Sequence, residues 1–167
     1  MMIKNNKTQI PASQLWMPSI ITRLTQAEDV SGIMPALYSF ETYVTEIQQD
    51  LIKLLNTKKI PLDITQPAQA CILTYGMPDL TLFNPDSAKD IETVRKLLEE
   101  TIEQFEQRLT NVTVLSKKQI QKTAPTMMSF CINAQIKINP QYMPIRFDSV
   151  IEPANDTVQI LNPMKRA

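Results

Sequence analysis

The feature that most constrains the fold is an alternation of apolar and polar residues between Met128 and Ile138. The even positions are apolar, and they are Phe130, Ile132, Ala134, Ile136 and Ile138. Successive side chains of a β-strand point to opposite faces of the sheet, so a period of two gathers the apolar side chains on one face. The pattern therefore predicts a strand with one face buried and the other more polar.

Two amphipathic helices are expected before this strand. The first begins near Pro35 and ends before Pro61, with an apolar stripe of Leu37, Phe40, Val44, Ile47, Leu51 and Leu54. The second begins with Pro85-Asp86-Ser87, which suits a helix cap, and its stripe comprises Ile91, Val94, Leu98, Ile102, Phe105 and Leu109. Spacings of three and four place each set on one helical face.

Shorter strands complete the expected fold. Residues 112–115, 145–151 and 158–161 are strand candidates, separated from their neighbours by turns at 139–144 and 153–156. Helices followed by a strand meander indicate an α+β fold, with two helices on one face of a largely antiparallel sheet of three to four strands. We expect a flexible arm at 1–17, one domain at 18–162 and a short tail at 163–167.

Composition excludes several classes of chemistry. The chain of 167 residues contains no histidine, so His-based triads and common zinc hydrolase sites are absent. With two glycines it lacks phosphate-binding loops. Lysine plus arginine and aspartate plus glutamate both number 17, which disfavours nucleic-acid binding. Cys71 and Cys131 have no metal or redox spacing and suit reduced thiols of a cytosolic protein. We expect neither a metal nor a cofactor, and no membrane-spanning or signal segment.

Two opposite charges, Glu106 and Arg108, lie where the second helix should give way to a strand. Helix positions two apart point about 200° away from each other, so the two side chains could not pair if the helix continued. Each charge would then need a partner elsewhere in the fold, in solvent or on another protein. From the residues alone, the simpler interpretation is a solvated helix end at which Arg108 interacts with the helix dipole.

Five segments occur together in an order and spacing that are fairly specific as a set. They are Pro18–Leu24, Asp50–Thr57, Tyr75–Leu80, Phe105–Val112 and Ile145–Val150. Through them the chain, from about residue 18 to 160, resembles the TssE family of type VI secretion baseplate subunits and the related wedge proteins of contractile-tail phage baseplates. The pattern of that family at the helix end is Glu-Pro-Arg, and this chain has Gln107 in place of proline. Because proline restrains the backbone, Gln107 would let the helix run further.

The resemblance implies a fold like the interlocking domain of contractile sheath proteins. It also implies a cytoplasmic place in a complex docked at the inner membrane, beside TssF-like and TssG-like wedge subunits, where the chain would seed polymerisation of TssB/TssC-like sheath proteins. The Glu-Arg pair is an interaction site in the family, so Glu106, Gln107 and Arg108 become the expected partner-binding residues here.

Two further sets of residues have expected roles. Gly76, Pro78 and Asp79 favour a structural turn, with Gly76 at an unusual backbone angle and Asp79 capping the turn that follows. Val158 and Ile160 lie in the short last strand, which could present a free sheet edge to an extended arm of a sheath protein.

Other classes of function stay open at this point. The group is also called lysozyme-like, and a glycosidase needs two carboxylates about 5–10 Å apart, one with a raised pKa. Glu106 with Asp79 or Asp148 would be the candidates, although Arg108 favours a lowered carboxylate pKa. A generic α+β interaction module is the remaining alternative. We expect an assembly protein rather than an enzyme.

Overall fold

The computed structural model describes residues 39–60, 74–117, 126–138 and 141–161. The chain divides into two compact units, residues 1–47 and 48–167, and the boundary falls inside helix α2 (Phe40–Asn56). The predicted arm at 1–17, the tail at 163–167 and the segment Pro18–Leu24 lie outside the described residues. In the first unit, Ser39 Oγ accepts a hydrogen bond of 3.2 Å from the Thr42 N–H as α2 begins.

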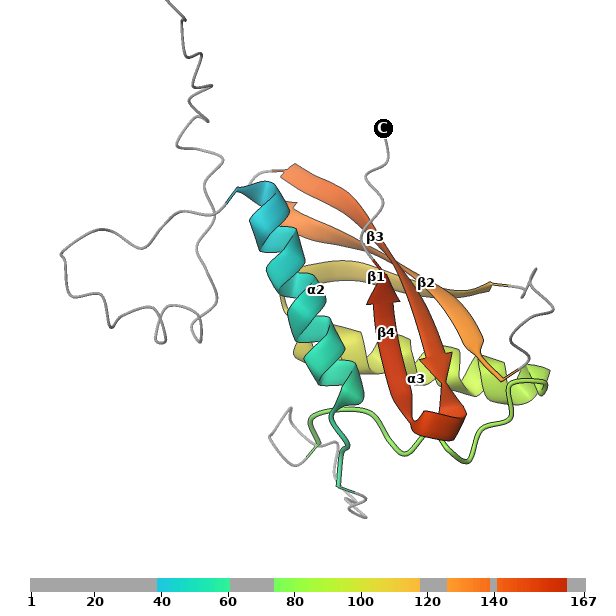
Figure 1. The fold of residues 1–167 in the computed structure, drawn as a ribbon. Helices are drawn as coiled ribbons and strands as arrows, with labels where there is room; N and C mark the ends of the chain where they lie inside the picture. Colours follow the sequence, from blue (N-terminus) through green and yellow to red (C-terminus); the bar gives the residue numbers. More distant parts are fainter. Residues whose placement is uncertain (1–38, 61–73, 118–125, 139–140, 162–167) are drawn as a thin grey trace, which may run out of the picture. The chain divides into compact units, whose positions relative to one another are not determined.

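The second unit contains the rest of the described structure. The end of α2 is followed by helix α3 (Ala88–Phe105) and by the strands β1 (Leu109–Lys117), β2 (Met128–Ile138), β3 (Gln141–Glu152) and β4 (Thr157–Leu161). A short 3-10 turn, η3 (Pro153–Asn155), connects β3 to β4. The four strands form one sheet in the order β1-β2-β3-β4, and each neighbouring pair is antiparallel (Figure 1). The prediction of an α+β fold with an antiparallel sheet is confirmed.

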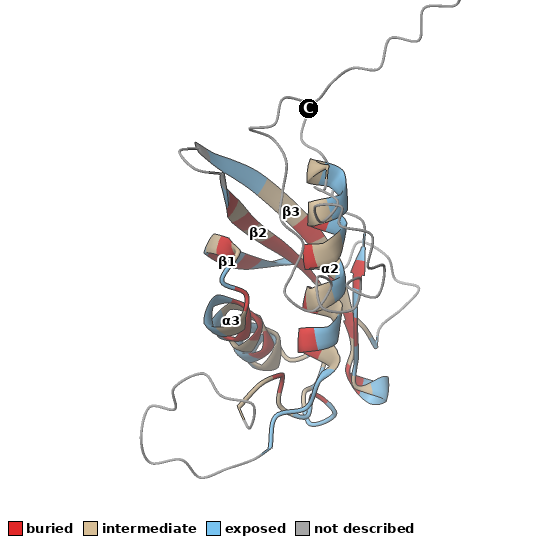
Figure 2. Cartoon of the chain, turned by 90° about the vertical axis from the view of Figure 1, so that its left-hand side faces the viewer, coloured by how far each residue is buried: buried red, intermediate tan, exposed pale blue. Residues whose placement is uncertain are grey.

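The core of the second unit follows the two predicted periodicities. In β2, Phe130, Ile132 and Ile136 are fully buried. In α3, Val94, Leu98 and Ile102 are buried on one side of the helix (Figure 2). Fully burying a side chain of this size stabilises a fold by about 1.5–3 kcal/mol, so these stripes fix which faces pack together. The free thiol of Cys131 is buried as well, and Cys71 lies outside the described residues.

Two boundaries differ from those expected. Residues 141–144, predicted as part of a turn, are the first residues of β3. Pro144 lies opposite Gln135 and has extended backbone, which is compatible with its fixed φ. The second helix ends at Phe105, and Leu109 is the first residue of β1 instead of the last apolar residue of the helix. The apolar pattern continues to Leu109 because that residue is buried as the first residue of β1.

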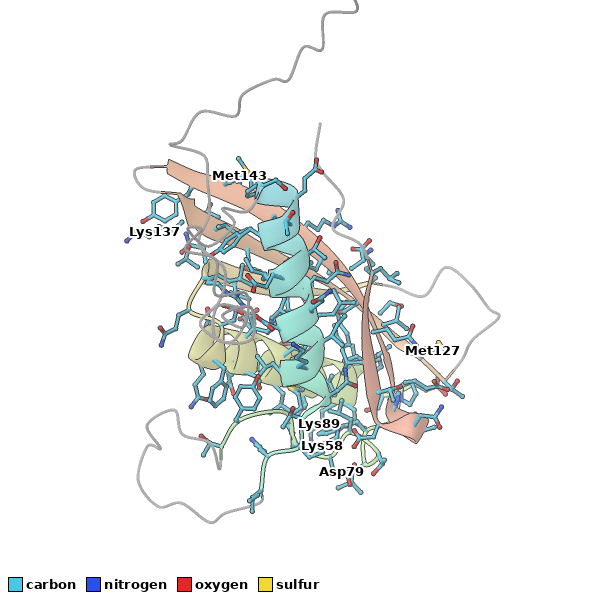
Figure 3. The ribbon with its side chains drawn as sticks, turned by 60° about the vertical axis from the view of Figure 1, so that its left-hand side comes forward. Lys58, Asp79, Lys89, Met127, Lys137 and Met143 are labelled. Carbon is cyan, nitrogen blue, oxygen red and sulfur yellow. The ribbon has the colours of Figure 1, made fainter. Side chains whose placement is uncertain are left out.

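The extent of β3 has a structural consequence. β4 pairs only with Asp148–Glu152 of β3, so Gln141–Phe147 pair with β2 alone among the described strands. Met143 and Lys137 lie at this end of the β2–β3 pair, whereas Lys58 and Asp79 lie at the opposite end of the sheet, towards η3 (Figure 3). On the β4 side of β3, no described strand therefore pairs with Gln141–Phe147.

Candidate docking site

The helix end that carries the two predicted charges is a tight turn. Glu106 is the C-cap of α3, with φ −104° and ψ 82°, and its N–H donates to Ile102 O over 2.9 Å. The Leu109 N–H donates to Glu106 O at 3.1 Å as β1 begins. The expectation that Gln107 would let the helix run further is therefore wrong. Leu109 is the first residue of β1 and pairs with Ile136 of β2. Only residues 106–108 therefore connect the end of α3 to the sheet.

Because the helix ends at Phe105, the two charges do pair with each other. Glu106 Oε1 accepts hydrogen bonds from Arg108 Nε at 2.8 Å and from the Arg108 backbone N–H at 3.1 Å. Arg108 Nη2 lies 2.5 Å from Glu106 Oε2 and 2.8 Å from Asp50 Oδ2 on α2. The expectation that each charge needs a partner elsewhere assumed that the helix continues through both residues, and the helix ends before them. Asp50, which was not among the predicted site residues, is the second carboxylate that Arg108 contacts.

The three groups form a part-buried charged cluster, which we call the helix-foot cluster (Asp50, Glu106 and Arg108). The Glu106 residue is 7% exposed, whereas 23% of the Arg108 side chain and 31% of the Asp50 side chain are exposed. Burial opposes the charge of Arg108, but the two carboxylates outweigh it and raise the pKa of the guanidinium. A buried carboxylate needs such a partner, so the cluster ties α2 to the α3–β1 turn.

An aromatic pair borders the cluster. The Tyr75 and Phe105 rings meet edge to face, with their centroids 5.2 Å apart. Burial raises the pKa of the Tyr75 hydroxyl, and the negative charges of Asp50 and Glu106 raise it further. Gln107, at the tip of the turn, is exposed. The arrangement presents Gln107 and the outer parts of Arg108 and Asp50 to solvent, while Glu106 points inward.

The predicted structural turn lies next to the end of α2. Gly76 has φ +108°, and an added Cβ there would overlap the Thr57 carbonyl, so only glycine fits. The Met77 N–H donates to Thr57 O at 2.8 Å. Asp79 Oδ1 accepts bonds from the Thr81 N–H at 2.9 Å and the Thr81 hydroxyl at 2.6 Å. Pro78 lies between these two contacts and is half-buried.

The predicted sheet-pairing residues lie in β4, which is an edge strand of the described sheet. Two amides of α2 contact the outer side of this strand. Gln48 Nε2 donates to Ile160 O at 2.9 Å, Asn56 Nδ2 donates to Val158 O at 2.8 Å, and the Val158 N–H donates to Asn56 Oδ1 at 2.9 Å. Sequence reasoning missed both amides. The sequence feature that could have indicated a shared contact is their spacing of eight residues, which places both amides within one stripe of α2.

The other sheet edge is contacted in a similar way by α3. The Val114 N–H donates to Glu99 Oε2 at 2.9 Å, and Arg95 Nη1 donates to Val114 O at 3.2 Å. Arg95 and Glu99 also pair with each other at 2.9 Å. Side chains of a helix therefore satisfy outward-facing backbone groups of each edge strand.

The candidate catalytic carboxylates are placed in different settings. Glu106 pairs with Arg108, Asp79 caps an exposed turn, and Asp148 on β3 contacts Lys117 Nζ at 2.7 Å. Hydrogen bonds from Thr81 lower the pKa of Asp79. Burial opposes the charge of Asp148, but Lys117 and Arg146 hold its pKa below the ordinary value. Neither of these two carboxyl groups has the raised pKa of a general acid.

Two cavities are lined by other residues. One lies between the start of α3 and the β1 and β2 ends, and it is lined by Pro85, Asp86, Ile91, Ser116, Lys117, Met127, Met128 and Ser129. The other lies on α3 and includes Glu92 and Glu100. Neither contains the three carboxylates considered above. Within residues 39–60, 74–117, 126–138 and 141–161, no cluster of three or more His, Cys, Asp or Glu side chains could hold a metal ion.

The described helices do not include one with the length and apolar character needed to span a membrane.

Comparison with known protein families identifies one family to which the chain is similar. The family model for baseplate wedge protein gp25 matches residues 41–141, which is more than half of the chain. The chain belongs to this family. No curated protein and no solved structure matches it.

Membership of the gp25 family gives the chain its general role. It is a structural component of a phage-like baseplate, and it interacts with other baseplate components. The matched residues include all of α3, β1 and β2, together with Asp50, Glu106 and Arg108. The resemblance expected from the sequence is confirmed at the level of this family.

Proposed function

We propose that this chain is a TssE-like baseplate subunit of a type VI secretion system, which docks in the wedge and nucleates the contractile sheath. The observation that carries the proposal is the Glu106–Arg108 pair at the end of α3, inside a gp25 family match. The proposed partners are TssF-like and TssG-like wedge subunits and TssB/TssC-like sheath proteins. The proposed location is the cytoplasm, in a complex docked at the inner membrane.

Docking would use the outer side of the helix foot. Gln107 is exposed, and parts of Arg108 and Asp50 remain accessible, whereas Glu106 is almost fully buried. Arginine suits such a surface because Glu106 and Asp50 hold its planar guanidinium, which fixes the exposed part of the side chain that a partner would contact. In this proposal Glu106 orients Arg108, and Arg108 and Gln107 contact the neighbouring subunit.

The docking test is affinity purification of tagged protein from the native host. Wild type is compared with Glu106→Ala/Arg108→Ala, which removes the pair, and with Gln107→Glu, which changes the exposed tip and leaves the pair in place. Circular dichroism and urea unfolding show whether each variant is folded. We expect wild type to capture wedge and sheath subunits, and both variants to lose the wedge subunits. Capture of none of these proteins by folded wild type would overturn the assignment to a type VI baseplate.

Sheath nucleation is proposed to involve the β4 edge at Val158 and Ile160. The support is that β4 is short and lies at the edge of the described sheet. An arm that added there by main-chain hydrogen bonds would replace the contacts of Gln48 and Asn56 with Val158 and Ile160. A proline at position 160 would remove an edge N–H that makes no hydrogen bond within the described residues. Val158→Pro is a poorer probe, because it also breaks the bond from the Val158 N–H to Asn56. We expect Ile160→Pro to block sheath assembly, whereas the control Ile160→Val should preserve it. Normal sheath with folded Ile160→Pro would rule out this edge.

A further inference from the structure

The start of β1 contains a β-bulge. Between the pairs Thr110–Gln135 and Thr113–Asn133 of the β1–β2 register, β1 has two residues and β2 has one. This is the arrangement of a bulge, in which one strand carries an extra residue. The first of the two β1 residues is Asn111, whose φ is +52°. Asparagine is one of the few residues besides glycine that adopt this left-handed conformation readily, so the bulge depends on the backbone of one residue.

The bulge changes which side chains of β1 face the core. Val112 and Val114 are buried, as alternation requires, and Leu109 is buried as well although it lies three positions before Val112. Without the extra residue Leu109 would face the outer side of the sheet, because side chains of a strand alternate with a period of two. Arg108 would then be carried toward the core. The bulge therefore buries Leu109 rather than Arg108.

Two side-chain bonds join the bulge to β2. Asn111 Nδ2 donates to Gln135 Oε1 at 2.8 Å, and the Thr110 hydroxyl donates to Gln135 O at 3.2 Å. The left-handed backbone does not need the amide bond, because glycine adopts the same conformation without a side chain. The backbone conformation and the side-chain bond of Asn111 can therefore be separated by substitution.

We propose that Asn111 is a positioning residue for the helix-foot cluster. Its left-handed backbone creates the bulge, the bulge buries Leu109, and the burial of Leu109 turns Arg108 toward Asp50 on α2. Only residues 106–108 connect α3 to β1, so the side on which Leu109 enters the sheet also sets the direction of Arg108. The inference rests on the proposed function in one respect, namely that the cluster docks onto a wedge subunit.

Protection of the sheet edge is the competing role for the bulge. β1 is an edge strand of the described sheet, and bulges are common at such edges. However, α3 already contacts this edge, because Glu99 accepts the Val114 N–H and Arg95 donates to Val114 O. A protective bulge has no need to lie beside the α3–β1 turn. A bulge that sets the direction of Arg108 has to lie between that residue and the regular part of β1, where it is found.

The first measurement is the solvent exchange of the Arg108 Nε–H, followed by NMR in the full chain. This group donates to Glu106 Oε1 at 2.8 Å, so its exchange reports the geometry of the cluster while the chain stays folded. Wild type is compared with Asn111→Gly, which keeps the left-handed conformation, and with Asn111→Val, whose β-branched side chain disfavours it. Thr113→Val is the matched control at an exposed position in the regular part of β1. Arg108→Lys identifies the signal by its loss.

We expect Asn111→Val to raise the exchange rate at least about threefold, because strain at the bulge is relieved by movement of Leu109 and the turn. Asn111→Gly and Thr113→Val should stay within about twofold of wild type. Asn111→Ala, which has a smaller side chain, takes the place of Asn111→Val if that variant does not fold. An unchanged rate in the folded Val or Ala variant overturns the proposal. An equal rise in Asn111→Gly overturns it too, because the left-handed backbone would then not be the cause.

The second measurement separates the positioning role from docking. Tagged wild type, Asn111→Gly and Asn111→Val are each co-produced with a TssF-like/TssG-like pair, and the captured amounts are compared. We expect equal capture by wild type and Asn111→Gly, and at least about threefold less by Asn111→Val. Reduced capture by Asn111→Gly at a wild-type exchange rate would show that the Asn111 side chain contacts the partner, which overturns the proposed role.

Two outcomes concern the proposed function alone. Equal capture by all three forms, with the exchange rates expected for Asn111→Val and Asn111→Gly, would retain the positioning role and reject docking through the cluster. Capture by no form would reject the proposed wedge partner, while the exchange rates of Arg108 still decide the positioning role.

Discussion

At the scale of single residues, Arg108 is the side chain on which the proposed docking site depends. It contacts Glu106 on its own turn and Asp50 on α2, so it connects two segments that are far apart in the sequence. Exposed ion pairs contribute little to stability, but a nearly buried carboxylate left without its partner is strongly destabilising. Glu106, with 7% of its surface exposed, is in the second situation.

Replacing Arg108 should therefore destabilise the fold as well as affect docking. We expect Arg108→Ala to lower the free energy of unfolding by about 2–3 kcal/mol, because the buried Glu106 carboxyl group loses its partner. Arg108→Lys should lose less, since it keeps the charge but not the planar fork that reaches both carboxylates. Urea unfolding followed by circular dichroism gives both values. A loss below about 0.5 kcal/mol for Arg108→Ala would show that the pair has no structural role.

Gln107 allows a second prediction at this scale. Its N–H makes no hydrogen bond within the described residues, and Glu106 before it already has non-helical backbone, as a residue preceding proline prefers. Gln107→Pro should thus raise the unfolding free energy by about 0.4–1 kcal/mol, through a less flexible unfolded chain. Thermal unfolding beside Gln107→Ala measures this. A lower melting temperature for Gln107→Pro than for Gln107→Ala would contradict it.

The sequence predicted the location of this site but not its geometry. Charge at Glu106 and Arg108 was visible in the pattern, whereas the early helix end depends on the pairing of Leu109 with Ile136 in the sheet. Asp50 was missed because an acidic residue on the polar side of a helix is usually solvated. Its contact with Arg108 is made across 58 residues of sequence, and periodicity carries no information on such a contact.

At the scale of elements, periodic segments were predicted best. β2 has the bounds that its alternating pattern indicates, because one face is uniformly apolar. The edge contacts of α3 and α2 were not predicted. In these contacts, polar side chains bond to backbone groups. Because every strand residue has the same backbone groups, the sequence does not indicate which of them a side chain will contact. Side-chain capping of edge strands follows from the packing of helix on sheet, which the sequence specifies only indirectly.

The contact of α3 with β1 leads to a prediction. Glu99 accepts the Val114 N–H, and Val114 is fully buried, so loss of the carboxylate leaves a strand donor without its partner. We expect Glu99→Ala to lower the unfolding free energy by about 1–2 kcal/mol. The control Glu103→Ala removes an exposed acid of the same helix and should change stability by less than about 0.5 kcal/mol. Equal effects of the two substitutions would show that the bond to Val114 contributes nothing.

At the scale of the whole molecule, charge balance and proton binding govern behaviour. The chain has equal numbers of acidic and basic residues, and its isoelectric point is near pH 6.3. Proteins without net charge associate more readily, because no long-range repulsion keeps them apart. We expect solubility of the isolated chain to be lowest near pH 6.3 and to rise toward about pH 4.5, because the chain has no histidine and its acidic side chains are the groups that take up protons below neutral pH. Precipitation assays across this range measure it, and a solubility that does not depend on pH would contradict it.

Stability should also depend on pH in the alkaline range. The pKa of Tyr75 is raised above 10.0 in the folded state, so the folded chain keeps a proton that the unfolded chain loses. Wherever the folded state binds more protons, the unfolding free energy falls as pH rises. The contribution of Tyr75 is fully present below about pH 10 and is lost as pH rises through the folded pKa. Tyr75→Phe should remove it, so the stability difference between wild type and variant should change with pH only above about pH 10.

The side-chain capping of both sheet edges has an evolutionary consequence. Gln48 and Asn56 at one edge, and Arg95 and Glu99 at the other, are each replaceable by a single amino-acid change, whereas removing a covering strand would alter the fold. A lineage can therefore weaken the contacts at one edge in a single mutational step and remove them in two. Descendants of such a chain can exchange binding partners while they inherit the same architecture.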